Sequence, residues 1–161
     1  VRFFESKTLL DLYSDWDSST VYRSNDRGTS WKLVSTAKSR IDAFSFPDTL
    51  RGFGIEHFNN ICSSVNGGRT WDKILDLRKG EVKTVLSSIF FINANVGYVT
   101  GNYGGNAIVL YTIDGGRNWN DLLNIPNVYI ARMYISTVGD IFIIGASKKR
   151  NIILKVNRTR I

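Results

Sequence analysis

The chain alternates between short apolar stretches and clusters of polar and glycine residues, and no segment shows the apolar period of an amphipathic helix. Residues 40–46 alternate polar and apolar side chains, which is typical of a strand with one buried face. Residues 89–92 and 141–144 are continuous apolar runs that suit strands buried on both faces. The pattern therefore predicts an all-β fold with little helix.

The expected strands fall into four groups, of which the third is the most regular. Strands are expected over residues 1–6, 9–14, 20–24 and 30–35, then 40–46, 51–56, 60–65 and 70–77, then 83–92, 96–101, 107–113 and 118–124, and finally 128–136, 140–146 and 151–156. Repeated four-stranded antiparallel units are typical of β-propeller blades, so the sequence predicts a β-propeller with about four blades in this chain. We expect a single propeller domain or propeller fragment, with blades over residues 1–36, 37–78, 79–127 and 128–161.

A polar motif recurs where the third expected strand of a group turns into the fourth. Its skeleton is Ser/Thr-x-Asp/Asn-x-Gly-x-x-Trp, and it occurs at residues 24–31, 64–71 and 112–119 but not in the fourth group. Asp or Asn followed by glycine favours a tight hairpin, and the Asp or Asn side chain can hold the turn through backbone N–H groups. We therefore interpret the motif as a structural clasp. Its members are Ser24, Asp26, Gly28 and Trp31, then Ser64, Asn66, Gly68 and Trp71, then Thr112, Asp114, Gly116 and Trp119.

A metal or phosphate loop is the alternative interpretation of this motif. A calcium loop needs several carboxylates at alternating positions, yet each copy has at most one acidic residue and the second copy has none. The Gly-Lys-Ser/Thr of a phosphate-binding loop is absent, and one cysteine with one histidine cannot form a structural zinc site. The sequence thus predicts no metal and no cofactor.

The three copies resemble the Asp-box, or bacterial neuraminidase repeat, of sialidase-like propellers, whose pattern is Ser/Thr-x-Asp-x-Gly-x-Thr-Trp. Ser30, Asn66 and Asn118 depart from that pattern. The run FINANVGYVTG at 91–101, followed by LYTIDGG at 110–116, is more closely similar to the photosystem II stability and assembly-factor propellers and their bacterial relatives. This resemblance implies a non-enzymatic protein that binds proteins. It also implies an extracytoplasmic location (secreted, periplasmic or cell-surface), because the bacterial relatives are mostly exported.

Catalytic chemistry finds little support in the sequence. A sialidase-like enzyme is expected to carry an Arg-Ile-Pro stretch, whereas Arg40-Ile41-Asp42 lacks the proline. A glycosidase needs two carboxylates facing the scissile bond, and no spacing links the acidic residues Asp15, Asp17, Asp42 and Glu56. We assign no catalytic residue. The alternative is a fragment of a sialidase-like or other glycoside hydrolase whose catalytic residues lie outside this chain.

In a propeller, the turns between second and third strands and the connections between blades lie on one face. The Asp-box-like motifs lie on the opposite face. The chain carries a net charge of +7, and basic and aromatic residues gather on the expected face opposite the motifs. They predict an acidic partner, either a protein or an anionic glycan. Nucleic acid is disfavoured because the basic residues form no known motif. The alternative is an ordinary solvated rim. The candidate binding residues are Trp16, Lys38, Arg40, His57, Arg78, Lys83, Tyr103, Tyr129 and Arg150.

The remaining features concern completeness. Cys62 is the sole cysteine and is expected to be buried, and no apolar run approaches the roughly 18–20 residues of a transmembrane helix. A start at Val1 favours a processed or truncated product. Three arrangements stay open: a fragment of a longer propeller, two chains closing one ring, or a four-bladed ring in which residues 1–6 complete the last blade. An incomplete ring exposes strand edges, which predicts self-association.

Overall fold

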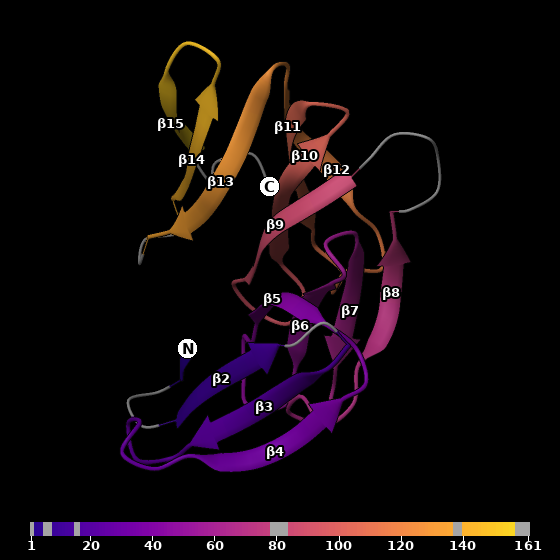
Figure 1. Ribbon diagram of the computed structural model, residues 1–161, viewed down its shortest axis with the longest axis vertical. Helices are drawn as coiled ribbons and strands as arrows, with labels where there is room; N and C mark the ends of the chain where they lie inside the picture. The colour runs from indigo at the N-terminus through magenta and orange to yellow at the C-terminus, as the bar shows by residue number, and fades with distance from the viewer. Residues whose placement is uncertain (1, 5–7, 15–16, 78–83, 137–139, 157–161) are drawn as a thin grey trace.

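Figure 1 shows the computed structural model of the protein, which describes residues 2–4, 8–14, 17–77, 84–136 and 140–156. These residues form fifteen β-strands and no helix. The strands are β1 (Arg2–Phe4), β2 (Thr8–Ser14), β3 (Ser19–Ser24), β4 (Lys32–Ala37), β5 (Ile41–Ser45), β6 (Gly52–Glu56), β7 (Asn60–Ser64), β8 (Asp72–Asp76), β9 (Thr84–Phe91), β10 (Gly97–Tyr103), β11 (Asn106–Thr112), β12 (Asn120–Ile125), β13 (Val128–Ile135), β14 (Ile141–Ser147) and β15 (Asn151–Val156).

The strands form four antiparallel sheets, each made of strands that are consecutive along the chain. We call them blade 1 (β1–β4), blade 2 (β5–β8), blade 3 (β9–β12) and blade 4 (β13–β15). The blades follow one another around an arc, from indigo to yellow in Figure 1. The predicted all-β propeller architecture with about four blades is confirmed, in the form of a partial propeller.

The outer strand pair of each four-stranded blade carries an irregularity at an equivalent place. The register shifts between Val21 and Tyr22 in blade 1, between Ile61 and Cys62 in blade 2, and between Val109 and Leu110 in blade 3. A bulge of this kind increases the local twist of a strand pair. The shift lies three residues before the motif Ser or Thr in each blade, so it recurs with the repeat.

The hydrophobic core lies between neighbouring blades. Blades 2 and 3 meet around Phe53 and Phe91, whose rings stack with centroids 3.4 Å apart. Glycine at the start of a second strand makes room for such rings. A Cβ at Gly52 would lie 2.5 Å from the Phe46 ring, and one at Gly97 would lie 2.6 Å from the Phe91 ring. The buried residues between blades 3 and 4 are Tyr98, Ala107, Val109, Val128, Ile130, Ile141 and Ile143.

Cys62 lies in β7, opposite Gly54 of β6, and is buried. Burial raises the pKa of its thiol to about 12, and the nearby Glu56 carboxylate adds to the effect. The thiol therefore stays protonated at neutral pH.

The predicted four-bladed ring in which residues 1–6 complete the last blade is wrong. Strand β1 pairs with β2, with Arg2 opposite Leu10 and Phe4 opposite Thr8, so the N-terminal strand belongs to blade 1. It cannot complete blade 4, which has three strands in the described residues. The described part of the chain also holds no helix of the length and apolarity needed to cross a membrane.

Candidate functional site

The recurring motif forms a hydrogen-bonded clasp at the hairpin between the third and fourth strands. In blade 3 the Thr112 hydroxyl accepts the Gly116 N–H at 2.9 Å and donates to Asp114 Oδ1 at 2.8 Å. Asp114 Oδ1 in turn accepts the Asn118 N–H at 2.9 Å, and Gly116 has a φ of 85°. The same bonds recur at Ser24, Asp26, Gly28 and Ser30, and at Ser64, Asn66, Gly68 and Thr70.

The clasp carboxylates are fully engaged by the turn itself. Hydrogen bonds from Ser30 lower the pKa of Asp26 to about 2, and hydrogen bonds from Asn118 lower the pKa of Asp114 to about 2. In the second copy, the neutral Asn66 accepts the same backbone N–H and donates from its amide to Thr70 Oγ1 at 2.8 Å. An uncharged side chain thus forms the same clasp, so the geometry does not need a carboxylate.

The tryptophans of the clasps differ in their polar contacts. Trp31 and Trp119 each donate from Nε1 to the carbonyl oxygen of the clasp glycine at 3.1 Å. The Nε1 of Trp71 is buried without a hydrogen-bond partner, while its ring packs edge-on against Phe46 at 5.7 Å. Blade 2 therefore retains the apolar contact of the motif without the indole hydrogen bond.

The face opposite the clasps carries the six described candidate residues. His57 and Arg150 lie in turns between second and third strands, and Tyr103 ends β10 at such a turn. Lys38 and Arg40 lie in the connection between blades 1 and 2, and Tyr129 lies near the start of β13. Trp16, Arg78 and Lys83 lie outside the described residues.

Arg40 and His57 belong to one cluster, which also contains Asp42 and Phe58, and the His57 N–H donates to the Arg40 carbonyl at 3.2 Å. Arg40 Nε donates to Asp42 Oδ1 at 2.6 Å, and the Phe58 N–H donates to Asp42 Oδ2 at 2.8 Å. The Arg40 guanidinium lies over the Phe58 ring, 4.5 Å from its centroid. The Asp42 carboxylate thus holds the cation and the aromatic ring together at the tip of blade 2. We call these four residues the Arg40–Phe58 cluster.

The cluster is fixed to the rest of the protein through its turn. The Phe58 carbonyl accepts the Leu86 N–H of β9 at 2.5 Å, which ties the tip of blade 2 to blade 3. Beside it, Glu56 accepts hydrogen bonds from the Ser39 hydroxyl and, at 3.0 Å, from Asn60 Nδ2. These carboxylates have definite structural partners, and the half-exposed Phe58 ring lies beside the partly buried, ion-paired Arg40 guanidinium.

The backbone of this tip is strained. His57 and Phe58 have φ values of 48° and 63°, and the Asn59 N–H donates to the Glu56 carbonyl across the turn at 3.2 Å. The corresponding turn of blade 3 is one residue shorter, because Tyr103 pairs with Asn106 whereas Glu56 pairs with Asn60, and it uses Gly104 and Gly105 with φ values of 57° and 85°. Positive φ at both central positions favours glycine or asparagine, so blade 2 places two large side chains where blade 3 has none.

The other candidates are distributed along the same face. Tyr103 lines a groove of about 360 Å³ between blades 2 and 3, together with Leu77 and Thr84. Arg150 lines a separate groove between blades 3 and 4. No group of three or more potential metal ligands lies together within the described residues.

The sequence did not identify Asp42 as the residue that joins Arg40 to Phe58. The sequence pattern did indicate that Asp42 lies beside Arg40, because residues two apart in an alternating stretch share one face of the expected strand. Phe58 carried no turn signal, since aromatic residues are unusual at positive φ.

The fold and the clasps define an Asp-box-type β-propeller, and comparison with known proteins agrees. A family model described as photosynthesis system II assembly factor YCF48 matches residues 27–140. Because this match covers most of the chain, the chain belongs to that family. The resemblance noted in the sequence is thereby confirmed. A search of curated proteins finds no match.

Solved structures show the same fold at low identity. YCF48 bound to D1 peptide has a TM-score of 0.58 and 17% identity over 96% of this chain and 56% of that chain. YCF48 from Cyanidioschyzon merolae has a TM-score of 0.55 and 16% identity over 96% and 58% of the two chains. The GH74 xyloglucanase from Xanthomonas campestris has a TM-score of 0.71 and 12% identity over 94% and 27%. The chain thus spans little more than half of the YCF48 structures and about a quarter of the xyloglucanase.

Proposed function

We propose that the protein is a non-catalytic binding and scaffolding module that recognises another protein through the face opposite the clasps. The observation that carries the proposal is the strained turn at His57 and Phe58. Each non-glycine residue held in such a backbone conformation costs about 1–3 kcal/mol, and such strain tends to occur at functional sites. Blade 3 makes the corresponding turn with glycines, so the fold does not require large side chains there.

The basic and aromatic residues of the face opposite the clasps favour an acidic partner surface with apolar content. Arginine and aromatic side chains are the residue types that contribute most at protein interfaces. The guanidinium is already held by Asp42 and the ring, so little side-chain freedom is lost on binding. The solved YCF48 structure with a D1 peptide supports a protein as the class of partner. An anionic glycan is the other ligand class that the basic surface fits.

The alternative is part of a glycoside hydrolase, and the similarity of fold to GH74 enzymes favours it. A sequence identity of 12–14% supports a shared fold but does not support a shared activity. Incubation of the protein with xyloglucan, followed by measurement of released reducing ends, tests this alternative directly. Release above the buffer control would replace the binding proposal.

The binding proposal is tested by affinity capture from an extract of the source cells at low salt. Wild-type protein is compared with Arg40→Glu, with Phe58→Ala and with the control Arg117→Glu, which reverses an exposed charge at a clasp. We expect at least one protein whose recovery falls about tenfold in both cluster variants and is unchanged in the control. Equal recovery by all four proteins would contradict the proposal. Binding of heparin that depends on the same residues would instead identify a glycan as the ligand.

We also propose an extracytoplasmic location, on the basis of the exported bacterial relatives. Fractionation of the source cells, with immunodetection of this chain, checks it. Recovery in the cytoplasmic fraction alone would contradict it.

A further inference from the structure

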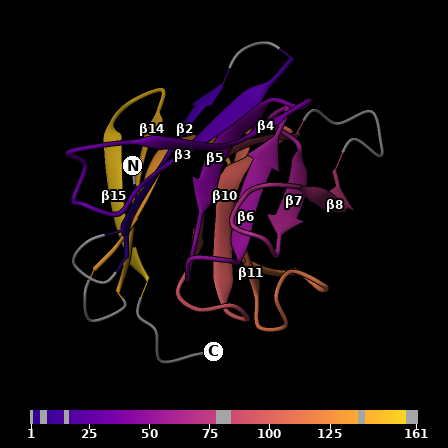
Figure 2. The same cartoon turned by 90° about the horizontal axis from the view of Figure 1, so that it is seen from below.

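A groove of about 410 Å³ lies between blades 1 and 2, on the side of the molecule that carries the clasps. Both views show these two blades side by side, from indigo to magenta (Figures 1 and 2). The end of β3, the clasp of blade 1 and the start of β4 supply most of the lining, and the clasp of blade 2 supplies Arg69. All of these residues fall within the continuous described range 17–77.

Three basic side chains line this groove, namely Arg23, Lys32 and Arg69. Arg23 and Lys32 are direct partners in the β3–β4 ladder, so both project from the same face of blade 1. None of the three pairs with a carboxylate in the part of the chain that the structure describes. The acidic residue of the lining is Asp26, whose oxygens already accept hydrogen bonds within its own clasp. Three cations and one carboxylate give the groove a net charge of +2.

Backbone carbonyls of blade 2 hold both guanidinium groups in place. Arg23 Nη2 donates to the Thr49 carbonyl at 2.8 Å, and Gly67 leaves space for it because a Cβ there would lie 2.5 Å from this nitrogen. Arg69 Nη1 donates to the Asn66 carbonyl at 3.0 Å. Arg23 Nε is buried without a hydrogen-bond partner among the described residues. Buried donors normally have an acceptor, so this nitrogen marks Arg23 as a group that can take a further one.

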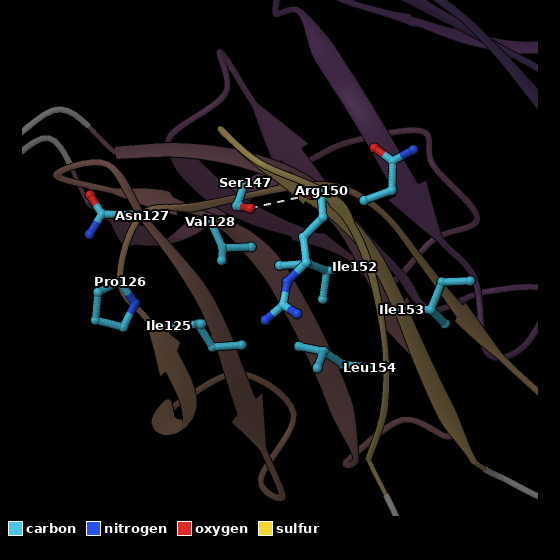
Figure 3. A pocket seen from close by; sticks show the side chains of 10 residues that line it. Ile125, Pro126, Asn127, Val128, Ser147, Arg150, Ile152, Ile153 and Leu154 are labelled. Carbon is cyan, nitrogen blue, oxygen red and sulfur yellow. Dashed lines mark hydrogen bonds between the residues drawn. The ribbon is translucent and has the colours of Figure 1, made fainter.

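The other blades do not repeat this charge pattern. The cross-strand pair that flanks the clasp is Arg23–Lys32 in blade 1, Ser63–Asp72 in blade 2 and Tyr111–Asn120 in blade 3. The groove between blades 3 and 4 also differs, because the basic residue of its described lining is Arg150 alone, beside Ile152 and Leu154 (Figure 3). The three cations are therefore a property of one groove, and the repeat does not require them.

The charge and the size of the groove favour a phosphomonoester as its ligand. A phosphate ester group carries about −1.5 to −2 charges at neutral pH and three acceptor oxygens, which matches a site with three cations and a net charge of +2. Guanidinium groups bind phosphate through paired hydrogen bonds, and lysine adds a point charge. The volume falls in the range of roughly 300–1,000 Å³ that small-molecule sites have. Leu33 and Val34 complete the lining and offer apolar contact to the organic part of such a ligand.

We propose that this groove binds a small phosphomonoester, with the phosphate between Arg23, Lys32 and Arg69 and the organic group against Leu33 and Val34. Binding uses side chains and leaves the backbone hydrogen bonds of the clasps intact. The site lies on the clasp side of the blades, away from the face proposed to bind a protein. It therefore adds a second kind of ligand and goes beyond the function proposed above.

The test is a calorimetric titration of the whole chain with phenyl phosphate, in dilute salt at neutral pH. We expect saturable binding of one ligand per chain. Phenyl sulfate has nearly the same shape and one negative charge fewer, so it should bind about tenfold more weakly or worse. Arg69→Gln and Lys32→Gln each remove an exposed cation of the groove and should weaken the binding of phenyl phosphate about tenfold.

The matched control is Arg117→Gln, which removes an exposed arginine at the position of the blade 3 clasp that corresponds to Arg69, and it should bind as wild type. Arg40→Glu should also bind as wild type, which separates this site from the proposed function. Absence of saturable binding to the wild-type chain overturns the proposal, as does equal affinity in Arg69→Gln and Arg117→Gln.

Two further results would contradict the choice of ligand. Equal affinity for phenyl phosphate and phenyl sulfate overturns the proposal, because the site would then not distinguish a dianion from a monoanion. Sedimentation with vesicles of phosphatidic acid that is lost in Lys32→Gln, without binding of phenyl phosphate, overturns it by identifying a lipid headgroup as the ligand.

Discussion

Blades 2 and 3 share one plan and differ at their two ends. Each has four strands, a register shift in the outer pair, and a phenylalanine over a glycine at the start of the second strand. At one end, the clasp of blade 2 uses Asn66 where blade 3 uses Asp114. At the other end, blade 2 has a strained aromatic turn where blade 3 has two glycines. The comparison shows that the clasp and the ring over glycine define a blade, while the turn on the opposite face is free to carry function.

The clasp hydroxyl is expected to be equally important in both blades, and its removal should give the largest loss. Thr112→Val and Ser64→Ala each leave buried N–H groups without an acceptor and should lower the free energy of unfolding by about 1–3 kcal/mol. Urea unfolding measures the loss. The control Ile113→Thr changes an exposed neighbour and should have little effect. A clear loss in only one blade would show that the two clasps are not equivalent.

Substitutions in the turns between the second and third strands should change the free energy of unfolding in opposite directions in blades 2 and 3. A Cβ at Gly105 would meet no atom within 4 Å, so Gly105→Ala tests the backbone alone and should cost about 1–2 kcal/mol. Phe58→Gly should relieve similar strain, offset by about 0.5–1 kcal/mol for the lost contact with Arg40. Thermal and urea unfolding of both variants checks the signs. Destabilisation by Phe58→Gly would mean that the packing of the Phe58 ring stabilises the fold, so the strained turn would need no functional explanation.

Replacement of the clasp tryptophan by phenylalanine should lower the free energy of unfolding by about 1 kcal/mol more in blade 3 than in blade 2. Trp119→Phe removes the hydrogen bond to the Gly116 carbonyl, whereas Trp71→Phe removes a buried N–H that has no partner. Both changes lose a similar apolar area, so the difference between the two variants isolates the hydrogen bond. Equal losses of unfolding free energy in the two variants would refute this explanation.

The smallest expected effect is on the pH dependence of stability. The pKa of Asp114 is about 2 in the folded protein and near its ordinary value of 3.8 in the unfolded chain. The folded state therefore binds the proton more weakly, and its stabilisation is present above pH 3.8 and is lost as the pH falls toward 2. Asp114→Asn should reduce the fall in Tm across this window. Asn66→Asp should increase it, and unchanged profiles would contradict the assigned pKa.

The sequence was sufficient to predict the blades but not the site. Alternation of polar and apolar residues and the spacing of the clasps located all the described strands, because both signals are local. The cluster depends on contacts between turns, since Asp42 gains its role only when the β6–β7 hairpin folds back onto it. The unpaired Trp71 N–H could not be foreseen either, because its motif reads like the other two. The blade boundaries, the binding role of the candidate residues and the location of the protein stay predictions.

The buried thiol of Cys62 can serve as a chemical probe of local opening in blade 2. Alkylating reagents react with the thiolate, and a pKa of about 12 leaves almost none at neutral pH in the closed blade. Because it is the chain's single thiol, any labelling reports the moments at which blade 2 opens far enough to admit water. A ligand that holds the tip of that blade closed will slow the labelling, so one reaction can detect the binding of a partner before that partner has been identified.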